Sequence, residues 1–84
     1  MGMAGAVFGS RIIVQDLDEG VHETYVLARG EMLDIAAGHV SLASPIGQAL
    51  LGSQPGTVVI VDTPQRRRRL RVVKVSHEEE TARA

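Results

Sequence analysis

The sequence predicts an α+β domain in which a mostly antiparallel sheet packs on one short helix, in the order β-β-β-α-β-β. Valine and isoleucine are frequent, whereas the aromatic residues are only Phe8 and Tyr25, so the core must be aliphatic and rich in strand-forming side chains. A single segment carries helix signals at both of its ends. Turn residues separate the other apolar runs, and 84 residues make one small domain.

The first half of the chain predicts a hairpin followed by a shorter strand. Arg11–Leu17 and His22–Arg29 are rich in apolar and β-branched residues, and Asp18–Gly20 between them is typical of a turn. Residues 30–38 follow as a connection without clear helix caps. His39–Ala43 is predicted as another strand, which leads directly into the helix.

The segment Ser44–Gly52 is predicted as one complete short helix, because both of its ends are marked. Ser44 is suited to cap the first free N–H groups, Pro45 suits the first helical position, and Gly52 accommodates the left-handed conformation that closes a last turn. Three apolar residues spaced i, i+3 and i+4 share one face and should pack on the sheet: Ile46, Ala49 and Leu50.

Two more strands are predicted after the helix. The segments are a turn at Gln54–Gly56, a strand at Thr57–Asp62, a turn at residues 63–66 and a long final strand at Arg67–Ser76. We expect the folded domain to span residues 7–76. Residues 1–6 are expected to be disordered or derived from cloning, and residues 77–84 to form a flexible charged tail.

The composition limits the cellular compartment and the kinds of partner that we expect. It has no cysteine, and therefore no disulfide framework or thiolate metal site. No apolar run approaches the ~20 residues that span a membrane. We therefore expect a cytoplasmic protein without a membrane partner, present as a monomer or a weak homodimer.

The charges are segregated along the chain, although the formal net charge is only −1. Residues 16–34 contain six acidic residues against Arg29 alone, and residues 66–74 contain six basic residues and no acid. One interpretation is complementarity between neighbouring strands of the same molecule. The other is a basic stripe that faces nucleic acid or an acidic protein surface, with the candidate contacts Arg66, Arg67, Arg68, Arg69 and Arg71. The stripe lacks the interleaved aromatic residues on which single-strand binders stack bases.

The sequence contains no recognisable catalytic or metal-binding constellation. His22, His39 and His77 lie on separate predicted elements, without the short spacings of metal ligands. No serine lies in a nucleophile elbow, and no glycine pattern resembles a phosphate-binding loop. We therefore expect a protein that is not an enzyme and that uses no cofactor or metal.

One extended pattern resembles a known family. The matching segments are Val40–Gly52, Gly56, Val58–Val61, Thr63-Pro64 and Val72–Val75, with Gly9-Ser10 and residues 14–18 and 23–25 upstream. Together they are similar to the C-terminal domain of the bacterial Gre transcript-cleavage factors, over nearly the whole chain. The most specific part is the run Ser-Pro-x-x-x-Ala-Leu-Leu-Gly followed by the Thr-Pro turn.

This resemblance implies a fold like that of FK506-binding proteins (FKBP-like) and attachment to RNA polymerase. In the family this domain docks on the paired helices at the rim of the polymerase's secondary channel, while the acidic tip of a separate helical hairpin stimulates transcript cleavage. No stretch of this chain has the length or heptad pattern of that hairpin, so we expect binding without cleavage stimulation. The residues that match the docking motif are Ser44, Pro45 and Ile46.

Two alternative functions remain: a nucleic-acid-binding module that uses Arg66–Arg71 and a non-enzymatic interaction scaffold. Prolyl isomerase activity is not expected, because it depends on a pocket lined with several aromatic residues.

The sequence departs from these patterns at four positions. Ala43 occupies a position where the family commonly has Asp or Asn. Gln65-Arg66 replaces the usual Gly-Gly after Thr-Pro, so the turn must adopt another type or carry strain. Arg68 is in phase with inward-facing apolar residues, and we expect its side chain to cross the sheet edge with a buried aliphatic stem.

Overall fold

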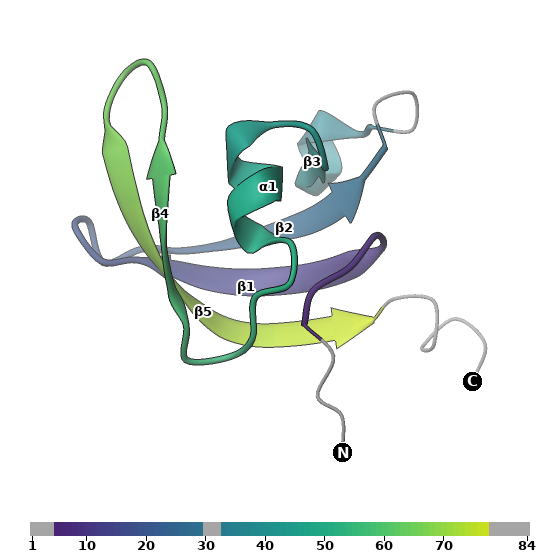
Figure 1. Ribbon diagram of the computed structural model, residues 1–84, viewed down its shortest axis with the longest axis horizontal. Helices are drawn as coiled ribbons and strands as arrows, with labels where there is room; N and C mark the ends of the chain where they lie inside the picture. Colours follow the sequence, from purple (N-terminus) through teal and green to yellow (C-terminus); the bar gives the residue numbers. More distant parts are fainter. Residues whose placement is uncertain (1–4, 30–32, 78–84) are drawn as a thin grey trace.

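The computed structural model describes residues 5–29 and 33–77, which form one curled sheet with a short helix on its concave side (Figure 1). The elements are β1 Ser10–Asp16, β2 His22–Ala28, the 3-10 helix η2 Ile35–Ala37, β3 His39–Ser41, α1 Pro45–Leu50, β4 Val58–Asp62 and β5 Arg67–His77. The order of strands and α-helix confirms the predicted α+β class. The short helix η2 lies inside the connection predicted at residues 30–38.

The spatial order of the strands is β3-β2-β1-β5-β4, so that β3 and β4 form the two edges. Neighbouring strands are antiparallel except for β2 and β3, which are parallel. A parallel pair cannot be joined by a tight turn. The segment that contains η2 supplies the longer connection, and the mostly antiparallel prediction is confirmed.

The core lies between α1 and the concave face of the sheet. Successive strand residues point to opposite faces, so β1 buries Ile12 and Val14 completely while Ile13 between them is only partly buried. Leu50 of α1 is fully buried in the same cluster, and this burial stabilises the fold by about 1.5–3 kcal/mol. The cluster consists of Ala6, Ile12, Val14, Leu27, Leu50, Val61, Leu70 and Val72, and is aliphatic as predicted.

The ends of the described chain differ slightly from the predicted boundaries. Ala6 lies in the segment 1–6, yet it is fully buried and its N–H donates to the carbonyl of Ser53 at 2.9 Å. The folded part therefore includes Ala6, one residue before the predicted start at Val7. At the other end, β5 continues to His77. Residues 1–4 and 78–84 of the predicted terminal segments lie outside the described residues.

A β-bulge in β5 changes which residues of that strand face the core. Ile13 pairs with Lys74, whereas the next residue, Val14, pairs with Val72, so Val73 has no partner of its own on β1. Val73 is 45% exposed. An extra residue of this kind shifts the inward-facing positions by one, which allows both Val72 and Val75 to pack on the core.

The helix α1 is shorter than predicted, because it ends at Leu50. Gly52 has a φ of 82°, the left-handed conformation expected of a glycine that follows a helix. On the predicted face, Leu50 is fully buried, and Ile46 and Ala49 are partly buried against the core. No helix within residues 5–29 and 33–77 is long and apolar enough to cross a membrane.

Candidate functional site

Two serine hydroxyls hold the loop that leads from β3 into α1. Ser44 Oγ accepts a hydrogen bond from the N–H of Gly47 at 3.1 Å and donates to the carbonyl of Ser41 at 2.7 Å. Ser41 Oγ accepts from the N–H of Ala43 at 3.0 Å. The helix cap predicted for Ser44 is therefore present. Ala43 needs no polar side chain for this geometry, because Ser41 binds its backbone.

The side chains of the three consecutive residues Ser44, Pro45 and Ile46 differ in their exposure and in their contacts. Pro45 is exposed at the first position of α1, as is Ala43 just before it. The hydroxyl of Ser44 is occupied by the bonds within the loop. Ile46 is partly buried and packs against the core, so it anchors the helix more than it faces solvent. Pro45 is thus the larger of the two exposed apolar side chains of this loop, on a backbone held by the hydrogen bonds of Ser41 and Ser44.

Gly47 is a structural requirement of the loop that the sequence interpretation missed. A Cβ atom at this position would lie 2.0 Å from the carbonyl oxygen of Ser41, which is too close for any other residue without a shift of the backbone. The only signal in the sequence was a glycine inside a helix, where it costs about 1 kcal/mol relative to alanine. Gly47 lets α1 begin directly against the end of β3.

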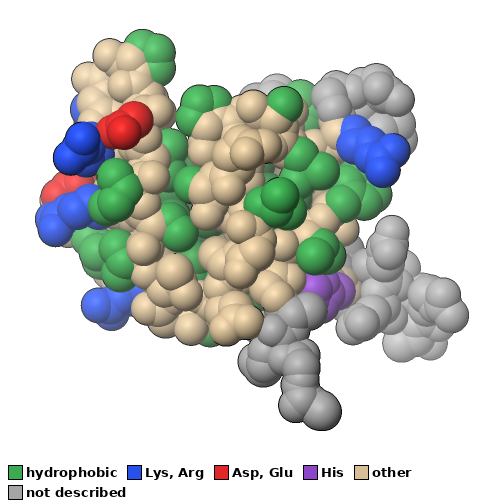
Figure 2. All heavy atoms as spheres, in the orientation of Figure 1, with side chains coloured by type: hydrophobic (Ala, Val, Ile, Leu, Met, Phe, Trp, Pro, Cys, Tyr) green, Lys and Arg blue, Asp and Glu red, His purple; other side chains and the backbone are tan. Residues whose placement is uncertain are grey.

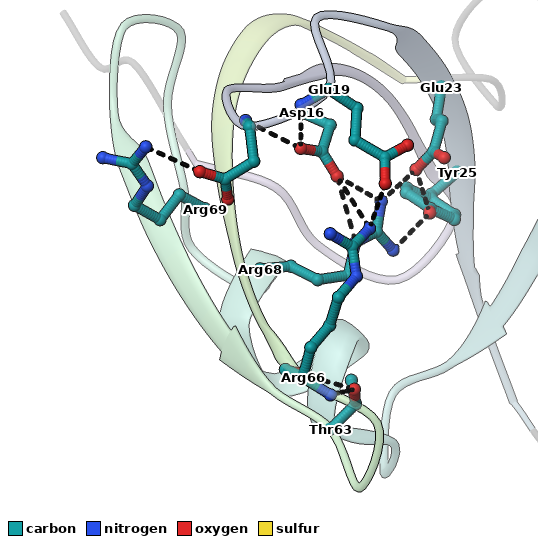
Figure 3. A network of polar contacts seen from close by, with 9 residues as sticks. Asp16, Glu19, Glu23, Tyr25, Thr63, Arg66, Arg68 and Arg69 are labelled. Carbon is teal, nitrogen blue, oxygen red and sulfur yellow. Dashed lines mark hydrogen bonds and ion pairs between the residues drawn. The ribbon is translucent and has the colours of Figure 1, made fainter.

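The second candidate region is a polar network centred on Arg68 at one end of the sheet (Figure 3). Its Nε and Nη2 donate to Asp16 Oδ2 at 3.3 and 3.2 Å, and Nη2 also donates to Glu23 Oε1 at 2.7 Å. Its Nη1 donates to the hydroxyl of Tyr25 at 3.3 Å, and that hydroxyl donates to Glu23. One guanidinium therefore joins β5 to β1 and β2.

Asp16 is the buried acceptor of this network, with a relative exposure of 1%. Its Oδ1 accepts from the backbone N–H groups of Asp18 and Glu19 at 2.9 and 3.0 Å, which shapes the β1–β2 turn. The Glu19 N–H is the main cause that lowers the pKa of Asp16, with further contributions from Asp18 and Arg68, and together they outweigh the opposing effect of burial. The carboxylate is thereby held in its ionised form.

The neighbours of Asp16 also have shifted pKa values. Burial raises the pKa of Glu23, but hydrogen bonds from Tyr25 and Arg68 lower it by more, so the net shift is downward. Burial and the bond to Glu23 raise the pKa of Tyr25. The bonds to Glu23 and Tyr25 raise the pKa of Arg68. All four groups therefore keep their ordinary charge states at neutral pH, which suits a structural network.

The position of Arg68 corrects the expectation that its side chain crosses a sheet edge. Arg68 pairs with Val61 of β4, whose side chain is 1% exposed in the core, and directly opposed residues of an antiparallel pair point to the same face of the sheet. The side chain remains on the core-facing side, because Asp16, Glu23 and Tyr25 supply partners for it there. Its 17% exposed side chain closes the end of the core.

The remaining members of the arginine run, except Arg71, also pair with acids. Arg66 lies 3.0 Å from Glu19 and 3.5 Å from Asp16, Arg67 lies 2.9 Å from Asp62, and Arg69 lies 2.7 Å from Asp18. Arg71 is exposed and forms no ion pair with the described residues. These pairs agree with the interpretation that neighbouring strands of one molecule carry complementary charge. A contact between the run and nucleic acid stays a prediction.

The turn between β4 and β5 is free of the strain expected if Gln65-Arg66 had to adopt the backbone conformation of the usual Gly-Gly. Thr63 Oγ1 donates to the carbonyl of Arg66 at 2.7 Å and accepts from its N–H at 3.2 Å. Within the described residues, positive φ occurs only at glycines. The turn therefore adopts another conformation, closed by the threonine side chain in place of glycine flexibility.

The histidines lie apart, as their sequence positions indicated. His77 Nδ1 is 3.2 Å from Ser10 Oγ, His39 Nδ1 accepts from the N–H of Asp34 at 3.2 Å, and His22 is exposed at the start of β2. Across the part of the chain that the structure describes, no group of three or more metal-ligating side chains is close enough to hold an ion.

Comparisons with known proteins converge on one family. The family model described as the C-terminal domain of the transcription elongation factors GreA and GreB matches residues 5–77. Transcription elongation factor GreA of Nitratidesulfovibrio vulgaris (strain Miyazaki F) is 35% identical over 72 residues, which cover 86% of this chain and 45% of that protein. GreA of Ralstonia nicotianae is 39% identical over 70 residues, covering 81% and 44%.

Solved structures agree with this match. GreA factor homolog 1 of Thermus aquaticus superposes with a TM-score of 0.78 at 29% identity, covering 90% of this chain and 50% of that one. The GreA/GreB factor of Nitrosomonas europaea superposes with a TM-score of 0.75 over 92% of this chain and 64% of that one; at 20% identity it supports the fold alone. The chain spans about half the length of the curated relatives that it matches.

Proposed function

We propose that this chain, which belongs to the family of GreA and GreB C-terminal domains, binds RNA polymerase on the paired helices at the rim of its secondary channel. It would do so in the bacterial cytoplasm, where the polymerase works. The relatives at 35% and 39% identity are transcription elongation factors, which supports the polymerase as the partner.

The observation that carries the proposal is the rigid presentation of Pro45. Ser41 and Ser44 fix the loop by three hydrogen bonds, and Gly47 allows α1 to start against β3. A proline that is exposed on such a support loses little conformational entropy when it is covered by a partner. Pro45 is therefore the contact residue, Ser44 holds the geometry, and Ile46 fastens the loop to the core.

We further propose that these 84 residues bind without stimulating transcript cleavage. In the family that activity resides in a helical hairpin with an acidic tip, and the sequence of this chain contains no segment with the corresponding heptad pattern. The acidic residues of the β1–β2 hairpin do not replace it, because Asp16, Asp18 and Glu19 are engaged by arginines of the same molecule.

A transcript-cleavage assay tests both parts of the proposal separately. Polymerase complexes with backtracked RNA are incubated with a full-length GreA factor and increasing amounts of this chain. We expect the chain alone to leave the RNA intact and to reduce cleavage by GreA through competition. Failure to compete at a large molar excess would contradict the docking, whereas cleavage by the chain alone would contradict the second part.

A further inference from the structure

The strand β4 forms an edge of the sheet whose backbone groups are available for pairing. The carbonyl of Thr57 accepts from Val72 at 2.7 Å, and the N–H of Thr63 donates to Arg66 at 3.0 Å, so the odd-numbered residues of this segment direct their backbone groups toward β5. Those of Val58, Ile60 and Asp62 point the other way. Within the described residues, these outward groups have no hydrogen-bond partner.

The centre of this edge is also apolar. Val58 and Ile60 are 45% and 49% exposed, on the sheet face opposite α1, while Val59 and Val61 point toward the core. Edge strands are usually protected from pairing by lysine, proline, a bulge or a covering segment. Between Val58 and Val61 the strand carries none of these residues, and its first charged side chain is Asp62. The strand order places β4 at the edge of the sheet, and Figure 1 shows α1 on the concave side.

We propose that β4 pairs with the β4 strand of a second copy of this chain, antiparallel and with the two-fold axis at Ile60. In this register Ile60 faces the partner's Ile60, and Val58 faces the partner's Asp62. These are the residues whose N–H and C=O groups point outward, so the register forms about six backbone hydrogen bonds between the two copies. The sheets of both molecules then become one continuous sheet.

Charge complementarity favours a second copy as the occupant of this edge. Val58 has Arg71 as its cross-strand neighbour on β5, and Arg71 is exposed without an ion pair to the described residues. In the joined sheet Arg71, Val58 and the partner's Asp62 lie in one row on the same face, where the carboxylate that Arg67 contacts at 2.9 Å within one molecule gains a second arginine from the other. Two strand spacings of roughly 4.8 Å separate Arg71 from that carboxylate, a distance that an extended arginine side chain bridges. In this register Asp62 does not lie opposite the partner's Asp62, so no like charges face each other. The two Ile60 side chains, which are β-branched, meet at the centre.

Association through this edge is weak. Two strands of five residues cover much less than the ~1,600 Å² of a standard protein interface. The dimer is therefore populated only at high protein concentration. Sedimentation equilibrium of the full chain up to about 1 mM is the suitable measurement, together with amide NMR spectra over the same dilution series.

Two lysine variants with the same charge change test whether dimerisation depends on this edge or on the outer face of the sheet in general. Ile60→Lys places two lysines opposite each other at the two-fold axis, and we expect the dimer dissociation constant to rise at least about tenfold. Val73→Lys alters a residue of similar exposure, 45% against 49%, on the interior strand β5, and we expect a change within about threefold. Ile60→Pro removes an N–H that points away from β5, so the fold should survive while dimerisation is lost.

The expected result for the unchanged chain is an average mass that rises from 9.0 kDa toward twice that value, with concentration-dependent amide shifts at Val58, Ile60 and Asp62. A chain that stays at 9.0 kDa throughout would overturn the proposal. So would equal effects of the two lysine variants, or dilution shifts confined to another surface. Edge amides that respond only to an added foreign peptide would likewise assign the edge to a different occupant and contradict the proposal.

Discussion

Arg68 and Asp16 are 52 residues apart in the sequence, yet Arg68 Nη2 lies 3.2 Å from Asp16 Oδ2 at the end of the core. Asp16 also organises the β1–β2 turn through its second oxygen. The pair therefore links the tip of the β1–β2 hairpin to the beginning of β5. Together with the pairs Arg66–Glu19 and Arg69–Asp18, it joins the arginine run to the acidic β1–β2 turn of the same molecule.

Replacing Arg68 by alanine should destabilise the domain. Asp16, 1% exposed, would lose its closest charged partner and keep only Arg66 at 3.5 Å. Breaking a pair of this kind costs about 2–3 kcal/mol after allowance for the partly exposed arginine and for the remaining contact with Arg66. Urea unfolding measures the change. Arg71→Ala is the matched control, since Arg71 is an exposed arginine on the same strand, and we expect it to change stability by less than about 0.5 kcal/mol. Equal effects of the two substitutions would contradict a structural role for the network.

The same network predicts a loss of stability in acid. The pKa values of Asp16 and Glu23 are lower in the folded state than those of ordinary carboxyl groups, so the unfolded chain binds protons first as the pH falls. Their contribution is complete above the ordinary carboxyl pKa of about 4 and is lost as the pH drops through the lowered folded values. Unfolding free energies measured between about pH 6 and pH 2 should fall, and should fall less steeply in Arg68→Ala. A pH-independent stability over this range would be inconsistent with the shifts.

Ser44→Ala should weaken the start of α1. The substitution removes the bond to the N–H of Gly47 and the bond to the carbonyl of Ser41, and loss of a serine cap costs about 1 kcal/mol. Ser44→Asn should recover part of this loss, because asparagine also caps helices. Chemical denaturation compares the three proteins. An alanine variant as stable as the unchanged chain would show that the cap contributes nothing.

Gly47→Ala should destabilise the protein even though alanine favours helices. Propensity alone predicts a gain of about 1 kcal/mol, but the new Cβ atom would lie 2.0 Å from the carbonyl of Ser41 and would force the loop and helix apart. A lower thermal midpoint than that of the unchanged chain is expected. A higher midpoint would mean that the helix start relaxes without cost.

Local signals were sufficient to predict most elements of this fold. The β-branched runs, the turn residues and the marked ends of the helix are each contained in a few consecutive residues, and β1, β2, α1, β4 and β5 lie within a few residues of their predicted bounds. The features that were missed depend on residues far apart in the chain. The bulge at Val73 is defined by the register with β1, and Ala6 joins the core through Ser53 and Gly52.

In the candidate sites, too, features set by neighbouring residues could be predicted, whereas features set by residues far apart in the chain could not. Ser44 and Pro45 could be found from sequence because capping is local. The requirement for Gly47 could not, since it arises from the approach of α1 to the end of β3. Arg68 was recognised as out of place among inward-facing residues, but its partners could not be named. They lie on β1 and β2, 43 to 52 residues away.

Binding of this chain to RNA polymerase, compared between Pro45→Ala and Pro55→Ala, tests the central claim most directly. Both prolines are exposed, but Pro45 begins α1 whereas Pro55 lies in the connection from the end of α1 to β4. Figure 1 shows that this connection leaves the end of α1 opposite to the loop from β3, and in the same orientation no charged side chain of the described residues covers α1 (Figure 2). With both variants folded, we predict that Pro45→Ala weakens the affinity on the order of tenfold, as expected for the loss of a central anchor, and that Pro55→Ala retains it. Unchanged affinity of a folded Pro45→Ala variant would contradict docking through this loop.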